Sequence, residues 1–293
     1  MPSYRFKQVD VFTNRPCYGN AVAVVLGAEG LSDADMQRIA GWTNLSETTF
    51  VLPPAAPGAD YLLRIFTPRE EMPFAGHPTI GSAHAVLEAG LASGPTLRQQ
   101  CGVGIVELRV EGQGADMLLW ARAPQARLVH DFSSSADAIS EALGAAVSKE
   151  PPPVSIANGP AFLFAQLRDS ATVGGLKPDM TALARLSRDF SVIGVAVFAL
   201  TDDGSQDAAR VHFRMFAPAT GVPEDPVTGS ANAALPLYLA RFGLLDRTGR
   251  EYVSRQGMEL GREGRVHIRV LDDDGSCEFG GQAVTVIEGE IRL

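Results

Sequence analysis

The two halves of the sequence repeat one pattern, and this repeat limits the folds that the chain can adopt. The first half contains Arg64-Ile-Phe-Thr-Pro68 and then His77-Pro-Thr-Ile-Gly-Ser-Ala83. The second half contains Arg214-Met-Phe-Ala-Pro218 and then Asp225-Pro-Val-Thr-Gly-Ser-Ala231. The copies lie 150 residues apart at the arginines and 148 residues apart at the Gly-Ser-Ala triplets. A repeat at about half the chain length indicates two copies of one structural unit.

The similarity continues downstream of these motifs. Arg98-Gln99, followed by a strand-like run at 106–110, matches Arg255-Gln256, followed by a similar run at 266–270. Chance similarity between Gly-, Ala- and Ser-rich segments would explain the triplet alone, but it does not explain an ordered series of matches. We therefore predict two lobes, 1–123 and 124–293, with the last strand able to cross back to the first lobe.

Composition and charge exclude several classes of function. The 293 residues carry 25 Lys and Arg against 34 Asp and Glu, and the net charge of −9 gives no overall attraction to nucleic acid or anionic lipid. The longest uncharged apolar runs, at 20–28 and 191–201, are shorter than the roughly 20 residues that a membrane-spanning helix needs. The N-terminal stretch is charged where a secretion signal is apolar, and three widely spaced cysteines fit a reducing compartment. We expect a cytoplasmic protein without nucleic-acid or membrane partners.

Local patterns predict a mixture of strands and helices. Ser32 is a helix-capping residue type, and it predicts a surface helix over 33–42. Apolar and β-branched runs predict strands at residues 5–12, 21–26, 48–52, 61–66, 105–110, 161–167, 192–200, 210–216, 265–271 and 283–287.

Two further helices, predicted over 78–89 and 226–241, correspond to each other in the repeat. Each has proline at its first position and glycine just beyond its end, at Gly90 and Gly243, where helices tolerate these residues. Pro236 is expected to kink or break the second helix. Both helices are apolar on nearly every face, which indicates burial on every side. The predicted fold class is α+β, with two similar lobes from an internal duplication, each a curled mixed β-sheet around a central buried helix.

The starts of these two helices are the first candidate site. The leading N–H groups of a helix have no internal partner and attract anions such as carboxylates. A duplication would bring both starts to a cleft between the lobes, where ligands commonly bind. The sequence leaves open whether Asp225 only caps its helix and whether His77 only fills a loop. The candidate catalytic and substrate-binding residues here are Gly76, His77, Ser82, Asp225, Thr228, Gly229 and Ser230.

Glu47 is a separate candidate because it directly precedes an apolar strand, in Asn44-Leu-Ser-Glu-Thr-Thr-Phe50. A carboxyl group that such a strand partly desolvates would have a raised pKa and could carry a proton near neutral pH. The alternative is that Glu47 is a solvated loop charge.

Motifs for common cofactors are absent from the sequence. It contains no Walker A loop, no G-x-G-x-x-G after a strand, no H-E-x-x-H and no G-x-S-x-G. Among the five histidines only His77 and His84 have helical spacing, and two helical turns are too far apart to share a zinc ion without other ligands. We expect no metal, nucleotide, flavin or other cofactor.

Four motifs, in order along the chain, carry a resemblance to a known family. They are Gln8-Val-Asp-Val-Phe-Thr13 with the following Gly19-Asn20, the segment around Glu47, Pro73-Phe-Ala-Gly-His-Pro78, and Glu224-Asp-Pro-Val-Thr-Gly-Ser230. With the terminal Gly280-Gly-Gln-Ala-Val284 they resemble the PhzF-like phenazine-biosynthesis family over essentially the whole chain. The resemblance implies a diaminopimelate-epimerase-like fold, frequent homodimers, and isomerisation of a dihydro-3-hydroxyanthranilate without a cofactor.

The resemblance also implies roles for individual residues. Glu47 looks like the general acid/base that moves the proton. His77, Asp225 and Ser230 look like the groups that orient the substrate and assist proton transfer, while Gly76 keeps the helix start open.

Relatives of this fold that racemise amino acids use two opposed cysteines at the helix starts. Cys17, Cys101 and Cys277 all lie elsewhere in this sequence, so the two-thiol route lacks its thiols. A single carrier such as Glu47 fits removal and return of a proton on one face of the substrate. We expect an isomerase for a small carboxylated, amino-bearing substrate. An epimerase or dehydratase of the same fold, and a non-catalytic metabolite-binding protein, are the alternatives.

Overall fold

The computed structural model describes residues 2–201 and 209–293, and the chain forms two compact units. The first unit consists of Met1–Arg122 and Gly280–Leu293, and the second consists of Ala123–Phe279. The chain enters the second unit beside Pro124 and returns to the first with its last strand. Among the described residues, no helix is both long and apolar enough to cross a membrane.

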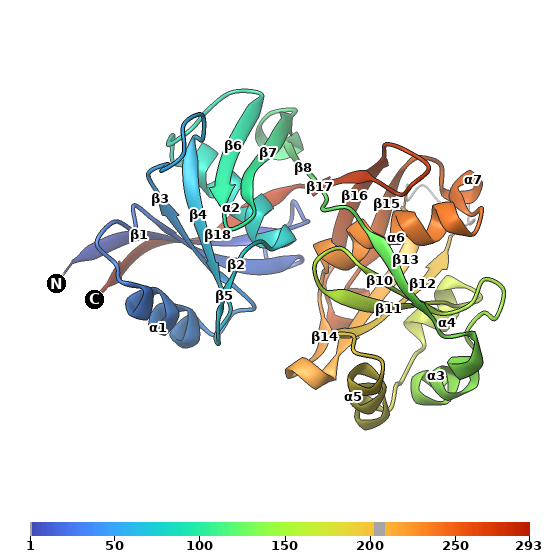
Figure 1. Ribbon diagram of the computed structural model, residues 1–293. Helices are drawn as coiled ribbons and strands as arrows, with labels where there is room; N and C mark the ends of the chain where they lie inside the picture. Colours follow the sequence, from blue (N-terminus) through green and yellow to red (C-terminus); the bar gives the residue numbers. More distant parts are fainter. Residues whose placement is uncertain (1, 202–208) are drawn as a thin grey trace. The chain divides into compact units, whose positions relative to one another are not determined.

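The first unit contains one surface helix and one enclosed helix (Figure 1). Its elements, in chain order, are β1 (Ser3–Val11), β2 (Asn20–Leu26), α1 (Asp33–Thr43), β3 (Thr48–Leu52), β4 (Tyr61–Phe66), β5 (Glu71–Met72), α2 (Gly76–Glu88), β6 (Thr96–Cys101), β7 (Gly104–Glu111), a 3₁₀ turn (Gly114–Asp116), β8 (Leu118–Arg122) and β18 (Ala283–Arg292).

Strand pairing in the first unit mixes parallel and antiparallel neighbours. β1 pairs antiparallel with β2 and with β18, which joins the two ends of the chain in one sheet. β2 and β3 are parallel, β3 and β4 antiparallel, β4 and β5 antiparallel, and β4 and β6 parallel. β6, β7 and β8 then form an antiparallel series. The strands curl around α2, which packs against β1, β2, β3, β8 and β18.

The second unit has the same plan with more helices on its outside. Its elements are β9 (Arg127–Asp131), a 3₁₀ turn (Ser133–Ser135), α3 (Ala136–Leu143), β10 (Val154–Ala157), β11 (Ala161–Gln166), α4 (Ser170–Gly174), α5 (Met180–Asp189), β12 (Gly194–Leu200), β13 (Ala209–Ala217), a 3₁₀ turn (Pro218–Thr220), β14 (Val222–Asp225), α6 (Gly229–Arg241), α7 (Leu245–Thr248), β15 (Glu251–Gln256), a 3₁₀ turn (Met258–Leu260) and β16 (Gly264–Val270), while β17 (Cys277–Gly281) spans the division between the units.

The repeat in the sequence is also a repeat in topology. β11 and β12 are parallel, β12 and β13 antiparallel, β13 and β14 antiparallel, β13 and β15 parallel, and β15 and β16 antiparallel. This is the order of β2, β3, β4, β5, β6 and β7 in the first unit. In each unit a short strand is followed by one buried helix: α2 follows β5, and α6 follows β14. The predicted α+β fold class with curled mixed sheets is therefore confirmed.

The surface helix and the strands follow their predictions closely. The Ser32 side chain accepts a hydrogen bond from the Asp35 N–H and caps α1, as expected. Every predicted strand is present, although β18 continues to Arg292, beyond the predicted end at 287. The inner face of α1 packs on β2, β3 and β4 through a cluster that includes Met36, Ile39 and Phe50.

The starts of the two buried helices differ from the prediction. Neither Pro78 nor Pro226 is the first helical residue: α2 begins two residues earlier at Gly76, and α6 begins at Gly229. Pro78 remains in the first turn, where its missing N–H leaves no bond unmade. α6 continues through Pro236, so the predicted alternative of a break there is wrong.

Candidate active site

Glu47 lies in the short link between α1 and β3. Asn44 ends the helix in the left-handed conformation, and the chain then joins the sheet beside β2. The Glu47 carbonyl already accepts a hydrogen bond from the Ala23 N–H at 3.4 Å, which extends the parallel pairing of β2 and β3 by one residue. The backbone of Glu47 is therefore anchored to the sheet although the residue precedes the strand.

The fold brings Glu47 into contact with His77. His77 is the second residue of α2, and its ring is buried, with 7% of its surface exposed. Its Nε2 lies 3.3 Å from Glu47 Oε2, and the Glu47 side chain is itself only 18% exposed. Glu47 and His77, which are 30 positions apart and were proposed as separate candidates, therefore contact each other in the first unit.

Burial affects the protonation of His77 in this pair. Burial lowers the pKa of His77 to about 4, against the opposing effect of a hydrogen bond to the Ala21 backbone, so the imidazole is neutral near pH 7. Nε2 does not make that bond, so the Ala21 carbonyl receives the Nδ1 proton. The lone pair of Nε2 then faces Glu47 Oε2.

The other predicted residues of α2 are packed inside the first unit. Gly76 is the buried first residue of the helix. Ser82 is fully buried, and its hydroxyl lies 2.8 Å from the Thr49 hydroxyl on β3. We therefore assign the Ser82 hydroxyl to packing of α2 on the sheet rather than to substrate contact.

In the second unit, Asp225 is the last residue of β14 and precedes α6 by four positions. Its side chain is half-buried, and Oδ2 accepts a 2.6 Å hydrogen bond from the Thr228 hydroxyl. Thr228 is the N-cap residue of α6, and the helix start has no side-chain cap. The N-cap position of α6 is therefore occupied by Thr228, and Asp225 contacts this residue from the preceding strand.

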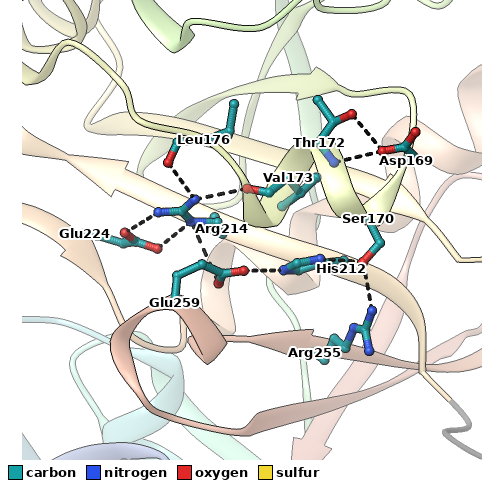
Figure 2. Close-up of polar contacts among 10 residues, drawn as sticks. All are labelled: Asp169, Ser170, Thr172, Val173, Leu176, His212, Arg214, Glu224, Arg255 and Glu259. Atoms are coloured by element: carbon teal, nitrogen blue, oxygen red, sulfur yellow. Dashed lines mark hydrogen bonds and ion pairs between the residues drawn. The ribbon is translucent and has the colours of Figure 1, made fainter.

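An ion pair fixes the strand that carries Asp225. The guanidinium of Arg214 on β13 donates two 2.8 Å hydrogen bonds to the carboxylate of Glu224, and both side chains are less than a tenth exposed. Arg214 also donates to the carbonyls of Val173 and Leu176, at 3.0 and 3.3 Å. Figure 2 shows how this arginine connects Glu224 on β14 to Val173 of α4 and to Leu176 just after that helix. A bidentate pair of this kind holds β14 in place next to Asp225.

The same network continues away from Asp225 along β13. Glu259 lies 3.8 Å from Arg214 Nε and 3.0 Å from Nε2 of the buried His212 (Figure 2). The His212 Nδ1 atom lies 2.7 Å from the Ser170 hydroxyl at the start of α4, and this hydroxyl also accepts a 2.8 Å bond from Arg255. Glu259 thus links Arg214 to His212, and the Ser170 hydroxyl links His212 to Arg255.

Gln256, at the end of β15, is a residue that sequence reasoning did not place in the site. Its Nε2 donates to the main-chain carbonyl of Asp225 at 2.9 Å and to the Thr228 hydroxyl at 3.0 Å. Its Oε1 accepts from the Thr228 N–H at 3.0 Å. The repeated Arg-Gln pairs of the sequence, with Gln99 in the first half, were the available signal.

Ser230 and Gly229 form the first turn of α6. The backbone carbonyl of Ser230 accepts a 2.8 Å hydrogen bond from Asn158 at the end of β10, while the residue itself is half-buried. Gly229 is buried. The second unit therefore gathers Asp225, Thr228, Gly229 and Ser230 within one turn and its adjoining strand, and the first unit gathers Glu47, Gly76 and His77.

Comparison with known proteins places this chain in a family. Residues 9–289 match the family described as phenazine biosynthesis-like proteins, PhzC-PhzF. The chain is 38% identical to antisense-enhancing sequence 1 of Schizosaccharomyces pombe, with 99% of each chain covered. It is 36% identical to the trans-2,3-dihydro-3-hydroxyanthranilate isomerase of Pseudomonas aeruginosa, with 97% of this chain and 94% of the relative covered.

Solved structures agree with this assignment. The crystal structure of a phenazine biosynthesis protein of the PhzF family from Bacillus anthracis covers 100% of both chains with a TM-score of 0.87 and 26% identity. A hydroxyproline epimerase from Agrobacterium vitis, 13% identical over 99% of this chain and 91% of its own, has a TM-score of 0.66 and shares the fold. The family match, the isomerases among the relatives and the shared diaminopimelate-epimerase-like fold show that the chain is an isomerase that belongs to the PhzF-like family.

Proposed function

We propose that this isomerase moves a proton between carbon atoms of a small cyclic or unsaturated amino or hydroxy acid, with Glu47 as general acid/base and without a cofactor. Relatives named trans-2,3-dihydro-3-hydroxyanthranilate isomerase, about a third identical over nearly the whole chain, support this substrate class. The single observation that supports the chemistry most strongly is the buried contact of Glu47 Oε2 with His77 Nε2 at 3.3 Å.

The reaction that we propose needs no oxidant or reductant. The Glu47 carboxylate takes a proton from an allylic carbon, and the electrons of the broken C–H bond form a new C=C bond. The Glu47 carboxyl group, whose proton exchanges with solvent before it is delivered, then protonates the far carbon of the original double bond. The electrons of that double bond form the new C–H bond, and Glu47 is again a carboxylate. His77 Nε2, which is unprotonated before the reaction, accepts a hydrogen bond from Glu47 while that residue carries the proton.

The second unit supplies orienting groups in this proposal. Asp225 accepts hydrogen bonds from the amino or hydroxyl groups of the substrate, and Ser230 contributes a hydroxyl in the first turn of α6. The N-cap residues Ala75 and Thr228 make no side-chain cap bond, and in this proposal backbone N–H groups at the helix starts bind the substrate carboxylate.

Proton exchange with solvent tests the proposal. Trans-2,3-dihydro-3-hydroxyanthranilate is incubated in D₂O with the wild type, with Glu47→Gln, and with Glu141→Gln, which alters an exposed carboxylate on α3. We expect isomerised product with deuterium at the carbon that gains the proton. Glu47→Gln should lower kcat by about 10² to 10⁴-fold, the usual contribution of a general acid/base, and Glu141→Gln should leave it unchanged.

The same experiment separates the alternatives. An epimerase would invert a stereocentre without moving the double bond, and a dehydratase would release water. A metabolite-binding protein would bind the compound with no exchange in any variant. Full activity of Glu47→Gln would exclude Glu47 as the proton carrier. A homodimer and a cytoplasmic location stay predictions.

A further inference from the structure

We propose that Gln256 and Thr228 are positioning residues that hold the Asp225 carboxylate in its working orientation. The inference rests on the proposed function, in which Asp225 orients the substrate. It adds two residues that would not touch the reacting atoms.

The hydrogen bonds form a chain whose direction is fixed. Gln256 Nε2 has two protons, and the Asp225 carbonyl and the Thr228 hydroxyl accept them, at 2.9 and 3.0 Å. Because the Thr228 oxygen accepts from an amide, its own proton points to Asp225 Oδ2 at 2.6 Å. The chain therefore holds both the backbone and one carboxylate oxygen of Asp225.

The Gln256 amide is itself held rigidly. Its Oε1 accepts from the Thr228 N–H at 3.0 Å and from Asn232 Nδ2 on α6 at 2.9 Å. With two bonds donated and two accepted, the amide group uses its full capacity. The side chain is fully buried, so water does not compete for these bonds. A buried and fully bonded amide has one orientation, and it transmits that orientation to Thr228 and Asp225.

The backbone after Gln256 packs closely against the loop 225–228, which contains Asp225 and Thr228. Gly257 has φ +96°, and a Cβ atom there would lie 2.6 Å from the Pro226 carbonyl oxygen. A Cβ on Gly264 would lie 2.2 Å from a methyl group of Val227. Two glycines therefore allow β15 and β16 to approach the loop 225–228 more closely than other residues would permit. This packing leaves the loop little room to move.

The first unit offers a matched control. Gln99 lies on β6, the counterpart of β15, two positions before the place that corresponds to Gln256, and is also fully buried. It accepts from the Tyr61 hydroxyl at 3.1 Å and donates to Thr79 Oγ1 at 3.1 Å. Its side-chain amide thus ties α2 to the sheet through Tyr61 and Thr79 and makes no contact with the proposed catalytic groups Glu47 and His77. Loss of either glutamine side chain should destabilise its unit, but only loss of Gln256 should release a proposed substrate-binding carboxylate.

The test uses Thr228→Val, Thr228→Ser, Gln256→Leu and Gln99→Leu in the full chain. Thr228→Val keeps the shape and removes no helix cap, because the Thr228 side chain does not cap α6. We expect kcat/KM to fall about 10- to 100-fold in Thr228→Val and Gln256→Leu, since a misplacement of about 1 Å can have that effect. Thr228→Ser, which keeps the hydroxyl, should stay within threefold of wild type, and so should Gln99→Leu.

A second arm distinguishes positioning from general damage. In an Asp225→Asn background, Thr228→Val should have almost no further effect on kcat/KM, because the two residues act through one group. An additional tenfold loss in that background would overturn the proposal. So would wild-type kcat/KM in Thr228→Val, which also serves if Gln256→Leu fails to fold.

Crystal structures of the wild type and Thr228→Val keep this inference separate from the proposed function. If the wild type does not turn over the substrate, the proposed function fails. The positioning role is then tested only by comparing the orientation of the Asp225 side chain in the two structures. A rotated Asp225 carboxylate in Thr228→Val supports the inference. An unchanged carboxylate overturns it.

Discussion

The two units share one plan but place different chemistry at the starts of their buried helices. α2 starts at Gly76, so His77 lies inside the helix and packs against Glu47. α6 starts at Gly229, so Asp225, which matches His77 in the repeat, stays on a strand and bonds to Thr228. A shift in where the helix begins places a buried imidazole in one unit and a half-buried carboxylate in the other.

The difference has a physical cause in the residues beneath each helix start. In the second unit, Gln256 bonds to the Asp225 carbonyl and to the Thr228 N–H, and these bonds favour a non-helical loop. In the first unit, the Gln99 side chain instead donates to the hydroxyl of Thr79, which already lies inside α2. The residues before Thr79 can therefore adopt the helical conformation. The glutamine of β6 therefore bonds inside its helix, whereas the glutamine of β15 bonds to the loop before its helix.

The arginine that precedes each buried helix also differs between the two units. Replacing it is expected to give the largest change in stability. Arg64 forms a bidentate pair with Glu71, just as Arg214 does with Glu224. Arg64, however, is 22% exposed, and its partners Glu71 and Asp33 are 43% and 84% exposed. Arg214 and Glu224 are 6% and 8% exposed. The first pair is solvated, whereas the second is part of the interior.

Replacing each arginine with methionine measures this contrast. Arg214→Met leaves Glu224 charged and buried, so the free energy of unfolding should fall by about 3 to 5 kcal/mol. Arg64→Met removes a solvated pair and should lower it by about 0 to 1 kcal/mol. Urea unfolding of the two variants and the wild type gives both values. Equal losses would show that burial does not distinguish the two pairs.

The buried imidazole of His77 in the first unit predicts that the stability of the protein depends on pH. The pKa of His77 is about 4 in the folded protein and near 6.5 when the chain is unfolded. As the pH falls from 6.5 to 4, His77 becomes protonated in the unfolded state but stays neutral in the folded state. The free energy of unfolding should therefore fall by about 3 kcal/mol across this window on account of His77.

Unfolding curves at several pH values between 7 and 4 test this expectation. His77→Asn should flatten the dependence in that window, whereas His130→Asn, which alters an exposed residue on β9, should leave it as in the wild type. A wild-type slope in His77→Asn would mean that burial of the imidazole does not limit its protonation.

Much of this architecture could be predicted from the sequence because it depends on local patterns and on the repeat. The apolar runs identified strands such as β3 and β4 at their observed bounds, and Ser32 identified the start of α1. The all-apolar character of α2 and α6 indicated their burial. These features depend on a few neighbouring residues, which is the range over which periodicity carries information.

The geometry of the site depends on contacts that are distant in sequence. Nothing near Glu47 specifies that His77 will contact it, because α2 must first pack against β2 and β3. Proline at the head of a helical pattern suggested a start at Pro226, but bonds from Gln256, 30 residues later, move the start to Gly229. Local propensity was outweighed by tertiary hydrogen bonds.

The smallest expected effect compares the two serines of the Gly-Ser-Ala repeats. Ser82 is fully buried against Thr49, whereas Ser230 is half-buried in the first turn of α6. Ser82→Ala removes one buried hydrogen bond and should lower the free energy of unfolding by about 1 kcal/mol with little change in kcat/KM. Ser230→Ala should do the reverse, with a change in stability within about 0.5 kcal/mol and a loss of kcat/KM. Urea unfolding and steady-state kinetics on both variants decide the matter. If Ser82→Ala lost activity while remaining stable, the two units would contribute matched hydroxyls to the substrate, and their chemistry would be less divergent than their helix starts.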